Sequence, residues 1–192
     1  MAQVGRLLSG IPQSGTRLGE PTAPVRMLLY SDLQCPVCSA FAQSDGFTRL
    51  VSDQVRAGNL QIVYRNLQTA TRDPHTFTTQ QVGALAAGRQ NRFWDYAELF
   101  YRQQGDENSG YVTAAYLTGL ARQVPGLDLA RWRTDRADPA LSGQLSADAA
   151  AGHAARVSAT PTLVMQGPKG AVRLPDAIPT YAQLQHALHA AS

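Results

Sequence analysis

The strand signals of this sequence fall into two groups, separated by a long region that has none. Val25 to Ser31 and Leu60 to Arg65 are apolar runs of strand length before that region, and Thr162 to Gln166 and Ala171 to Leu174 follow it. Between about residues 74 and 156 the apolar residues recur at helical spacing instead. A sheet whose sequence is interrupted in this way predicts an α/β domain that contains an inserted helical block.

The first group predicts a strand, a helix and a second strand parallel to the first. The helix begins at Pro36, where apolar residues start to recur at helical spacing, and ends at Gly58. This order is the usual connection between parallel neighbours in a sheet. The second group predicts a β-hairpin, because the turn-forming residues GPKG at 167–170 separate its short strands. A capping-box pattern then predicts a last helix over Tyr181 to Ala190.

The helical block begins with a capping signal. Asp73 is a favourable N-cap residue, and Pro74 fits the first helical position, where its missing N–H is not needed. Further segments of helical pattern are Gln80–Arg89, Phe93–Tyr101, Thr113–Val124 and Leu129–Arg136. We therefore expect an N-terminal extension over 1–19, an α/β domain formed by 20–73 and 157–192, and an inserted helical subdomain over 74–156.

The composition narrows the class of protein. Apolar residues make up 44% and charged residues 16% of the 192 residues, which is an ordinary globular balance and enough for a core without disulfides. The net charge of +3 is too small and too scattered to favour nucleic-acid binding. No stretch reaches the roughly 18 consecutive apolar residues of a membrane span. The first 25 residues have no signal-peptide core, so we expect a cytosolic protein or one whose export signal has been removed.

Both cysteines of the chain lie in the stretch LQCPVCSAF at 33–41. Cys35 is placed where a strand ends and a helix begins, and the free N–H groups and dipole of a helix start favour an anion such as a thiolate. Pro36 fits the first turn, and Cys38 lies on the same helical face one turn deeper. This spacing predicts a redox dithiol in which Cys35 is the exposed nucleophile and Cys38 the buried, resolving cysteine.

Other interpretations of the cysteine pair remain open. A structural zinc site would need further ligands from His75, His153, His186 or His189, and we expect no metal. Attachment of haem requires a histidine directly after the second cysteine, where this sequence has Ser39. An inert structural disulfide of short span is a further alternative. The aromatic residues of 93–101 are expected in the core, although some of them could line a substrate groove.

Three motifs together resemble the DsbA-like thiol-disulfide oxidoreductases. They are the CPVC motif at 35–38, the helical segment RFWDYAELF at 92–100, and SATPTLVMQG at 158–167. The resemblance runs from about Gly19 to the end of the chain. It implies a thioredoxin-like fold with an inserted all-helical subdomain, and a cis-proline at Pro161 that faces the dithiol. It also implies that Pro36, Val37, Thr160 and Pro161 contact the substrate, whose extended backbone would pair beside Thr160.

The sequence departs from this family at two positions near the dithiol. Members often carry a buried glutamate six residues before the first cysteine, which assists proton transfer to the buried cysteine, and Leu29 stands there. Asp32 is the nearest carboxylate and the candidate proton relay, although its position suggests a loop side chain rather than a buried one. Val37 replaces the histidine of strongly oxidising members, which removes a donor or positive charge near the thiolate.

The resemblance implies that the protein exchanges a Cys35–Cys38 disulfide with cysteines of unfolded or partly folded proteins, in the oxidising direction. A reductase or isomerase, or a non-catalytic, chaperone-like peptide-binding module, are the alternatives. No metal or organic cofactor is required. A membrane-bound, quinone-linked reoxidase is the implied partner. We expect a monomer in the periplasm or cell envelope, with the cytoplasm as the alternative compartment.

Overall fold

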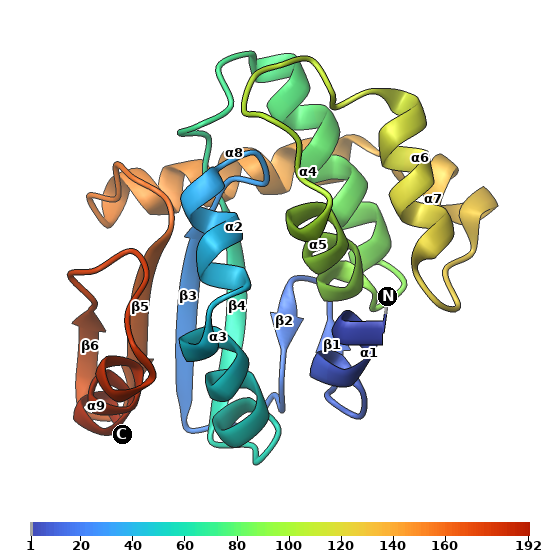
Figure 1. The fold of residues 1–192 in the computed structure, drawn as a ribbon. Helices are drawn as coiled ribbons and strands as arrows, with labels where there is room; N and C mark the ends of the chain where they lie inside the picture. Colours follow the sequence, from blue (N-terminus) through green and yellow to red (C-terminus); the bar gives the residue numbers. More distant parts are fainter. Residues whose placement is uncertain (1) are drawn as a thin grey trace.

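A mixed β-sheet forms the centre of the protein, whose computed structural model describes residues 2–192. Its six strands lie in the order β1-β2-β4-β3-β5-β6, which Figure 1 shows from right to left. The strands are β1 (Gln13–Ser14), β2 (Arg17–Leu18), β3 (Val25–Ser31), β4 (Leu60–Asn66), β5 (Thr162–Gly167) and β6 (Gly170–Arg173). β3, the strand that leads to Cys35, therefore lies between β4 and β5 in the interior of the sheet.

The pairing of the strands agrees with the order of signals in the sequence. β3 and β4 are parallel, with Val25 opposite Leu60 and Ser31 opposite Asn66, so the expected strand, helix and strand unit is confirmed. β5 runs antiparallel to β3 and continues through a turn into antiparallel β6, which confirms the hairpin. β3 is buried along most of its length, as its almost continuous apolar run requires.

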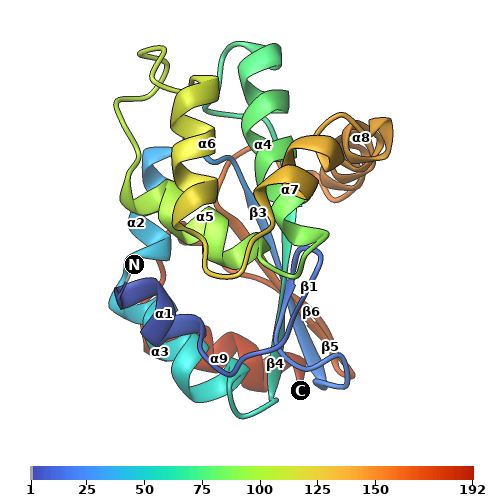
Figure 2. The same ribbon diagram turned by 90° about the vertical axis from the view of Figure 1, so that its right-hand side faces the viewer.

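Helices cover both faces of the sheet (Figures 1 and 2). On one face lie α2 (Pro36–Ala42), α3 (Asp45–Leu50) and α9 (Tyr181–Ala191), and α8 (Pro139–Ala154) lies on the other. The single helix expected from residue 36 to 58 is divided, which is a correction. Ser44 is a new N-cap that accepts the N–H of Phe47 at 3.1 Å, and α3 continues into the π-helical turn η1 (Val51–Val55). The apolar period continues across this break, so it did not reveal the second start.

The regular elements of the chain between β4 and β5 are all helices, joined by loops. These are α4 (Pro74–Gly88), α5 (Phe93–Arg102), α6 (Ala114–Gln123), α7 (Leu129–Asp135) and α8. Asp73 caps α4 as predicted, by accepting the N–H groups of His75 and Thr76. The aromatic side chains of α5 are buried and belong to the core. The division into separate domains at 74 and 156 stays a prediction.

The N-terminal segment contributes strands to the sheet, which the sequence did not reveal. α1 (Ala2–Leu8) precedes β1 and β2, and β2 pairs antiparallel with β4. The indole N–H of Trp94 in α5 donates to the carbonyl of Thr16 at 3.1 Å, and Leu18 is fully buried. Residues expected as an extension are thus packed on the sheet and on α5. Strands of two residues carry no detectable alternation, which explains the missed signal.

None of the helices within residues 2–192 combines the length and the hydropathy that a bilayer crossing demands.

Candidate active site

The reactive end of the molecule lies where β3 ends and α2 begins. Cys35 is the N-cap of α2, with extended backbone angles of φ −69° and ψ 119°, and Pro36 follows in the first turn. The sulfur of Cys35 accepts the backbone N–H of Cys38 at 3.4 Å. A cysteine sulfur therefore occupies the place of an ordinary capping oxygen, where free N–H groups and the helix dipole favour negative charge.

Both cysteine side chains are buried, which corrects the expectation that Cys35 is exposed. Cys35 is 5% and Cys38 2% exposed. In its protonated form Cys35 donates to the backbone carbonyl of Thr160 at 3.4 Å, so the chain before β5 covers its sulfur. Pro36 and Val37 are exposed beside it, and Val37 is 41% exposed. A reaction partner therefore has to approach along Val37 and the Thr160 backbone.

The two thiols have opposite acidities. The pKa of Cys35 falls to about 6, chiefly because the Cys38 thiol hydrogen-bonds its sulfur. The side chain of Thr160 and the N–H groups of Cys38 and Val37 lower this pKa as well, against the opposing effect of burial. Burial raises the pKa of Cys38 well above its ordinary value, and the neighbouring Cys35 raises it further. At neutral pH the pair therefore holds a thiolate at Cys35 and a thiol at Cys38.

Thr160 contacts Cys35 through its backbone carbonyl, and Pro161 follows it in the chain. The peptide bond between them is cis. The hydroxyl of Thr160 hydrogen-bonds the hydroxyl of Thr69, in the loop that follows β4. Pro161 is buried and lines a cavity of about 340 Å³ together with Ala159, Leu174 and neighbouring residues. The segment that the sequence analysis placed beside the dithiol therefore does contact Cys35, through the Thr160 carbonyl.

Asp32 lies in the loop after β3 but is fully buried, so the expectation that its side chain is not buried was wrong. Its carboxylate accepts hydrogen bonds of 2.6–3.2 Å from the backbone N–H groups of Gln34, Thr69, Ala70 and Thr71 and from the side chains of Thr71 and Gln80. Several N–H donors offset the cost of burying a carboxylate. Asp32 thus fastens the loop before Cys35 to the loop after β4, and its oxygens are engaged by donors other than the cysteines.

The helical block also supports the site, through residues that sequence reasoning missed. The side-chain amide of Gln104, just after α5, donates to the carbonyls of Leu33 at 2.7 Å and Cys35 at 3.3 Å. The backbone N–H of Asn108 donates to the side-chain carbonyl of Gln34 at 3.0 Å. Polar loop residues carry no periodic pattern, so no signal in the sequence connected them with the dithiol.

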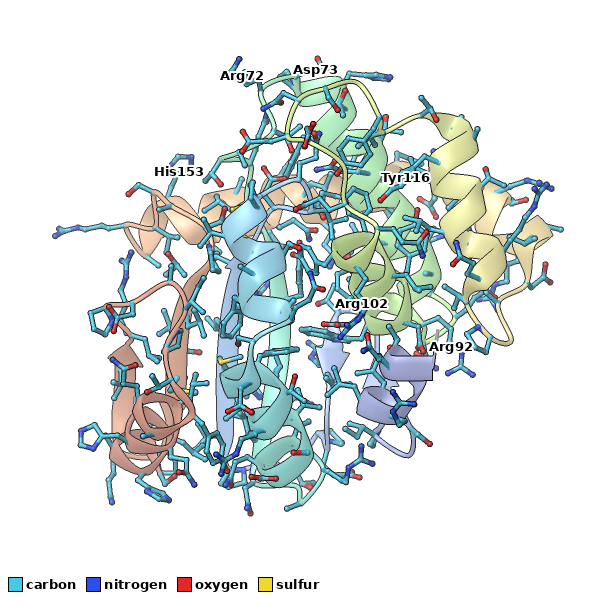
Figure 3. All side chains as sticks on the ribbon, in the orientation of Figure 1. Arg72, Asp73, Arg92, Arg102, Tyr116 and His153 are labelled. Carbon is cyan, nitrogen blue, oxygen red and sulfur yellow. The ribbon has the colours of Figure 1, made fainter. Side chains whose placement is uncertain are left out.

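A second, polar cavity of about 370 Å³ opens on this side of the site. Gln34, Arg72, Asp73, Thr76 and Asn108 are among the residues that line it. Figure 3 shows Arg72 and Asp73 together at the end of the molecule where α4 begins. Gln34, next to Cys35 in the chain, therefore borders this cavity, and Pro161, next to Thr160, borders the other.

Leu29, which stands where the family often has a glutamate, is buried in β3 opposite Tyr64 of β4 and Leu163 of β5. Hydroxyl groups instead lie near Cys38. Ser31, Tyr64 and Tyr101 form a buried cluster that the sequence analysis did not identify.

The histidines considered as zinc ligands are scattered over the fold. His75 lies in α4, His153 in α8, and His186 and His189 are exposed on α9. Within the described chain, 2–192, histidine, cysteine and carboxylate side chains nowhere gather in threes or more as a metal ion would require.

Comparison with known protein families agrees with this geometry. A family model described as Thioredoxin matches residues 13–190, which is most of the sequence. The chain belongs to the thioredoxin family. The match begins with β1, in agreement with the observation that the N-terminal strands are part of the sheet.

Two kinds of curated relatives match this thioredoxin-family chain. Disulfide bond formation protein D of Bacillus subtilis is 24% identical over 151 residues, covering 76% of this chain and 65% of that protein. The Na(+)/H(+) antiporter NhaA 1 of Salinispora arenicola is 31% identical over 150 residues, covering 78% of this chain and 21% of the antiporter. The chain thus spans less than two thirds of the first relative and about a fifth of the second.

Solved structures share the whole fold. BdbD from Bacillus subtilis, in its oxidised form, superposes with a TM-score of 0.77 at 20% identity, covering 95% of this chain and 96% of BdbD. DsbA2 of Pseudomonas aeruginosa gives a TM-score of 0.72 at 22% identity, covering 94% of this chain and 95% of the other. The expected thioredoxin-like fold of the DsbA type is therefore confirmed.

Proposed function

We propose that this thioredoxin-family protein is a thiol-disulfide oxidoreductase that exchanges a Cys35–Cys38 disulfide with cysteines of protein substrates. One observation carries the proposal. A sulfur with a pKa of about 6 caps the first turn of α2, and a second sulfur with a raised pKa is buried beside it. An attacking or attacked thiolate next to a protonated partner is the arrangement that disulfide exchange needs.

In the oxidising direction a substrate thiolate attacks the sulfur of Cys35 in the disulfide. The S–S bond breaks, its electron pair leaves on Cys38, and a mixed disulfide with the substrate forms. A second substrate thiolate then attacks the substrate sulfur and releases Cys35 as a thiolate. The substrate dithiol is oxidised and the enzyme disulfide reduced. One substrate proton is taken up by Cys38, and the other goes to solvent.

We assign substrate contact to Pro36, Val37, Thr160 and Pro161. Pro36 and Val37 are exposed beside the Cys35 sulfur, and Val37 is a large apolar side chain that a substrate can contact. An extended substrate can lie between the cavity at Gln34 and the cavity at Pro161, and its backbone can pair with that of Thr160. Asp32 holds the loop in place and is not assigned as the proton relay, because donors from two loops and α4 engage its carboxylate.

The direction of exchange follows from the thiolate of Cys35. A disulfide is oxidising to the extent that its reduced thiolate is stabilised, and attacking cysteines range from a pKa of about 3.5 in strong oxidants to about 7 in weakly reducing proteins. Cys35, at about 6, lies between them. We therefore propose an oxidant whose reduction potential lies between about −120 and −270 mV, on the oxidising side of the middle. A reductase would use the same residues at a potential near the lower limit of this range.

The substrates of this proposal are unfolded or partly folded proteins with cysteines, and the compartment is the periplasm or cell envelope. The relative named for disulfide bond formation supports the assignment of cysteine-containing substrates. Reoxidation of the dithiol is assigned to a membrane-bound, quinone-linked partner, and the protein acts as a monomer.

The proposal is tested with oxidised protein and a synthetic peptide that contains two cysteines. Oxidised wild-type protein should convert the peptide dithiol to a disulfide. Reduced Cys38→Ser, mixed with the disulfide form of the peptide, should accumulate a mixed disulfide at Cys35 that mass spectrometry detects, because no enzyme thiol is left to resolve it. Cys35→Ser should do neither. Equilibration with glutathione gives the potential and separates an oxidant from a reductase. Full peptide oxidation by Cys35→Ser, or none by the wild type, would contradict the proposal and favour a non-catalytic peptide-binding module.

A further inference from the structure

A chain of buried hydroxyl groups lies next to Cys38. The hydroxyls of Ser31 and Tyr101 are 2.7 Å apart, and those of Tyr101 and Tyr64 are 3.2 Å apart. Ser31 is 1%, Tyr64 0% and Tyr101 4% exposed. Hydrogen bonding from the Ser31 side chain lowers the pKa of Cys38, against the larger raising effect of burial. The hydroxyls thus form a connected path from Tyr64 through Tyr101 and Ser31 to the sulfur.

The fold brings these residues together from three elements. Alternate residues of a strand face the same side, so Ser31 lies on the same face of β3 as Leu29. Tyr64 is the partner of Leu29 on β4, and Tyr101 comes from the last turn of α5. The hydroxyl of Ser39, in α2, donates to the backbone carbonyl of Tyr101 at 2.9 Å and ties α5 to the cysteine helix. The hydroxyl path therefore lies beside Leu29.

The tyrosines remain donors at every working pH. Burial raises the pKa of Tyr64 and of Tyr101, and the nearby Cys38 raises both further. When Cys38 carries negative charge, Ser31 can donate to it, Tyr101 to Ser31, and Tyr64 to Tyr101. Hydrogen bonds aligned in one direction polarise one another in a site of low dielectric. Of the titratable groups near Cys38, Cys35 raises its pKa, and Cys38 in turn raises the pKa of Tyr64 and Tyr101.

We propose that Ser31, oriented by Tyr101 and Tyr64, stabilises the thiolate that forms on Cys38 when the disulfide opens. The inference rests on the proposed exchange function. Ser31 acts on the charge of Cys38 directly, and the tyrosines are positioning residues. The substrate thiolate bonds to Cys35, and the electron pair of the S–S bond goes to Cys38. The Ser31 hydroxyl donates a hydrogen bond to the Cys38 thiolate and stabilises it until Cys38 gains its proton.

The test uses Tyr101→Phe and Ser31→Ala in the full chain, with Tyr96→Phe as the matched control. The hydroxyl of Tyr96 is as deeply buried, but it donates to the carbonyl of Leu117 at 3.2 Å and belongs to a different part of α5. The rate of attack by the dithiol peptide on the oxidised protein, from acid quenching and mass spectrometry, should fall about tenfold in the first two variants and stay at the wild-type value in the control.

A second readout separates this role from a structural one. The hydroxyls act on a transition state that both directions cross, so forward and reverse rates should fall together while the potential against glutathione stays at the wild-type value. Wild-type rates in both Tyr101→Phe and Ser31→Ala, or an equal loss in Tyr96→Phe, would overturn the inference. If the wild type itself does not exchange disulfides, the proposed function fails instead, and thermal unfolding shows which variants are folded.

Discussion

At the scale of single residues, the acidity of Cys35 is the property that decides function. Its lowered pKa of about 6 means that the thiol predominates below that pH and the thiolate above it. The rate of alkylation by iodoacetamide should therefore rise with pH and reach half its maximum near pH 6, whereas an ordinary cysteine does so near about pH 8.5. The measurement is the pH dependence of Cys35 modification in reduced protein, read by mass spectrometry.

Cys38 provides the internal check of this prediction. Its thiol is the largest contributor to the low pKa of Cys35, so Cys38→Ala should move the half-maximum to higher pH. A half-maximum at or above pH 8 in the wild type would contradict the thiolate assignment and remove the basis for an oxidant.

At the scale of elements, the carboxylate of Asp32 connects the end of β3, the loop at 69–71 and α4. Asp32→Asn should destabilise the protein by more than about 3 kcal/mol, because an amide group would face N–H donors in a buried site and charge-assisted hydrogen bonds would be lost. Urea unfolding measures the change. Asp106→Asn, on an exposed loop, is the control and should change stability by about 0.5 kcal/mol or less.

An Asp32→Asn variant as stable as the control would show that the network contributes little. Loss of exchange activity without loss of stability would instead return Asp32 to the proton-relay role that the sequence first suggested.

At the scale of the whole molecule, the N-terminal segment is expected to be part of the folding unit. It buries Val4, Leu7, Leu8, Ile11 and Leu18. Removal of residues 1–18 should lower the melting temperature by at least about 10 °C, since each large apolar side chain lost from a core costs about 2–5 kcal/mol. Calorimetry of the truncated and full chains tests this. Equal melting temperatures would restore the view of a dispensable extension.

The sequence by itself determined the order of the main elements and the position of both cysteines at the start of a helix. Apolar runs of strand length, helical periods, the cap at Asp73 and the turn at 167–170 are local signals, and each reports the structure of its own segment. The placement of Cys35 at a helix start is local as well, because Pro36 and the preceding strand define it.

Only the tertiary structure decided which distant residues meet around the cysteines. The contact of Thr160 with Cys35 joins two parts of the chain that the sequence could relate only by a family resemblance. The burial of Asp32, the support from Gln104 and the hydroxyl path through Tyr64 and Tyr101 had no signal at all. Polar contacts between elements far apart in the chain depend on packing and on the need to satisfy every buried donor and acceptor, and neither leaves a periodic pattern in the sequence.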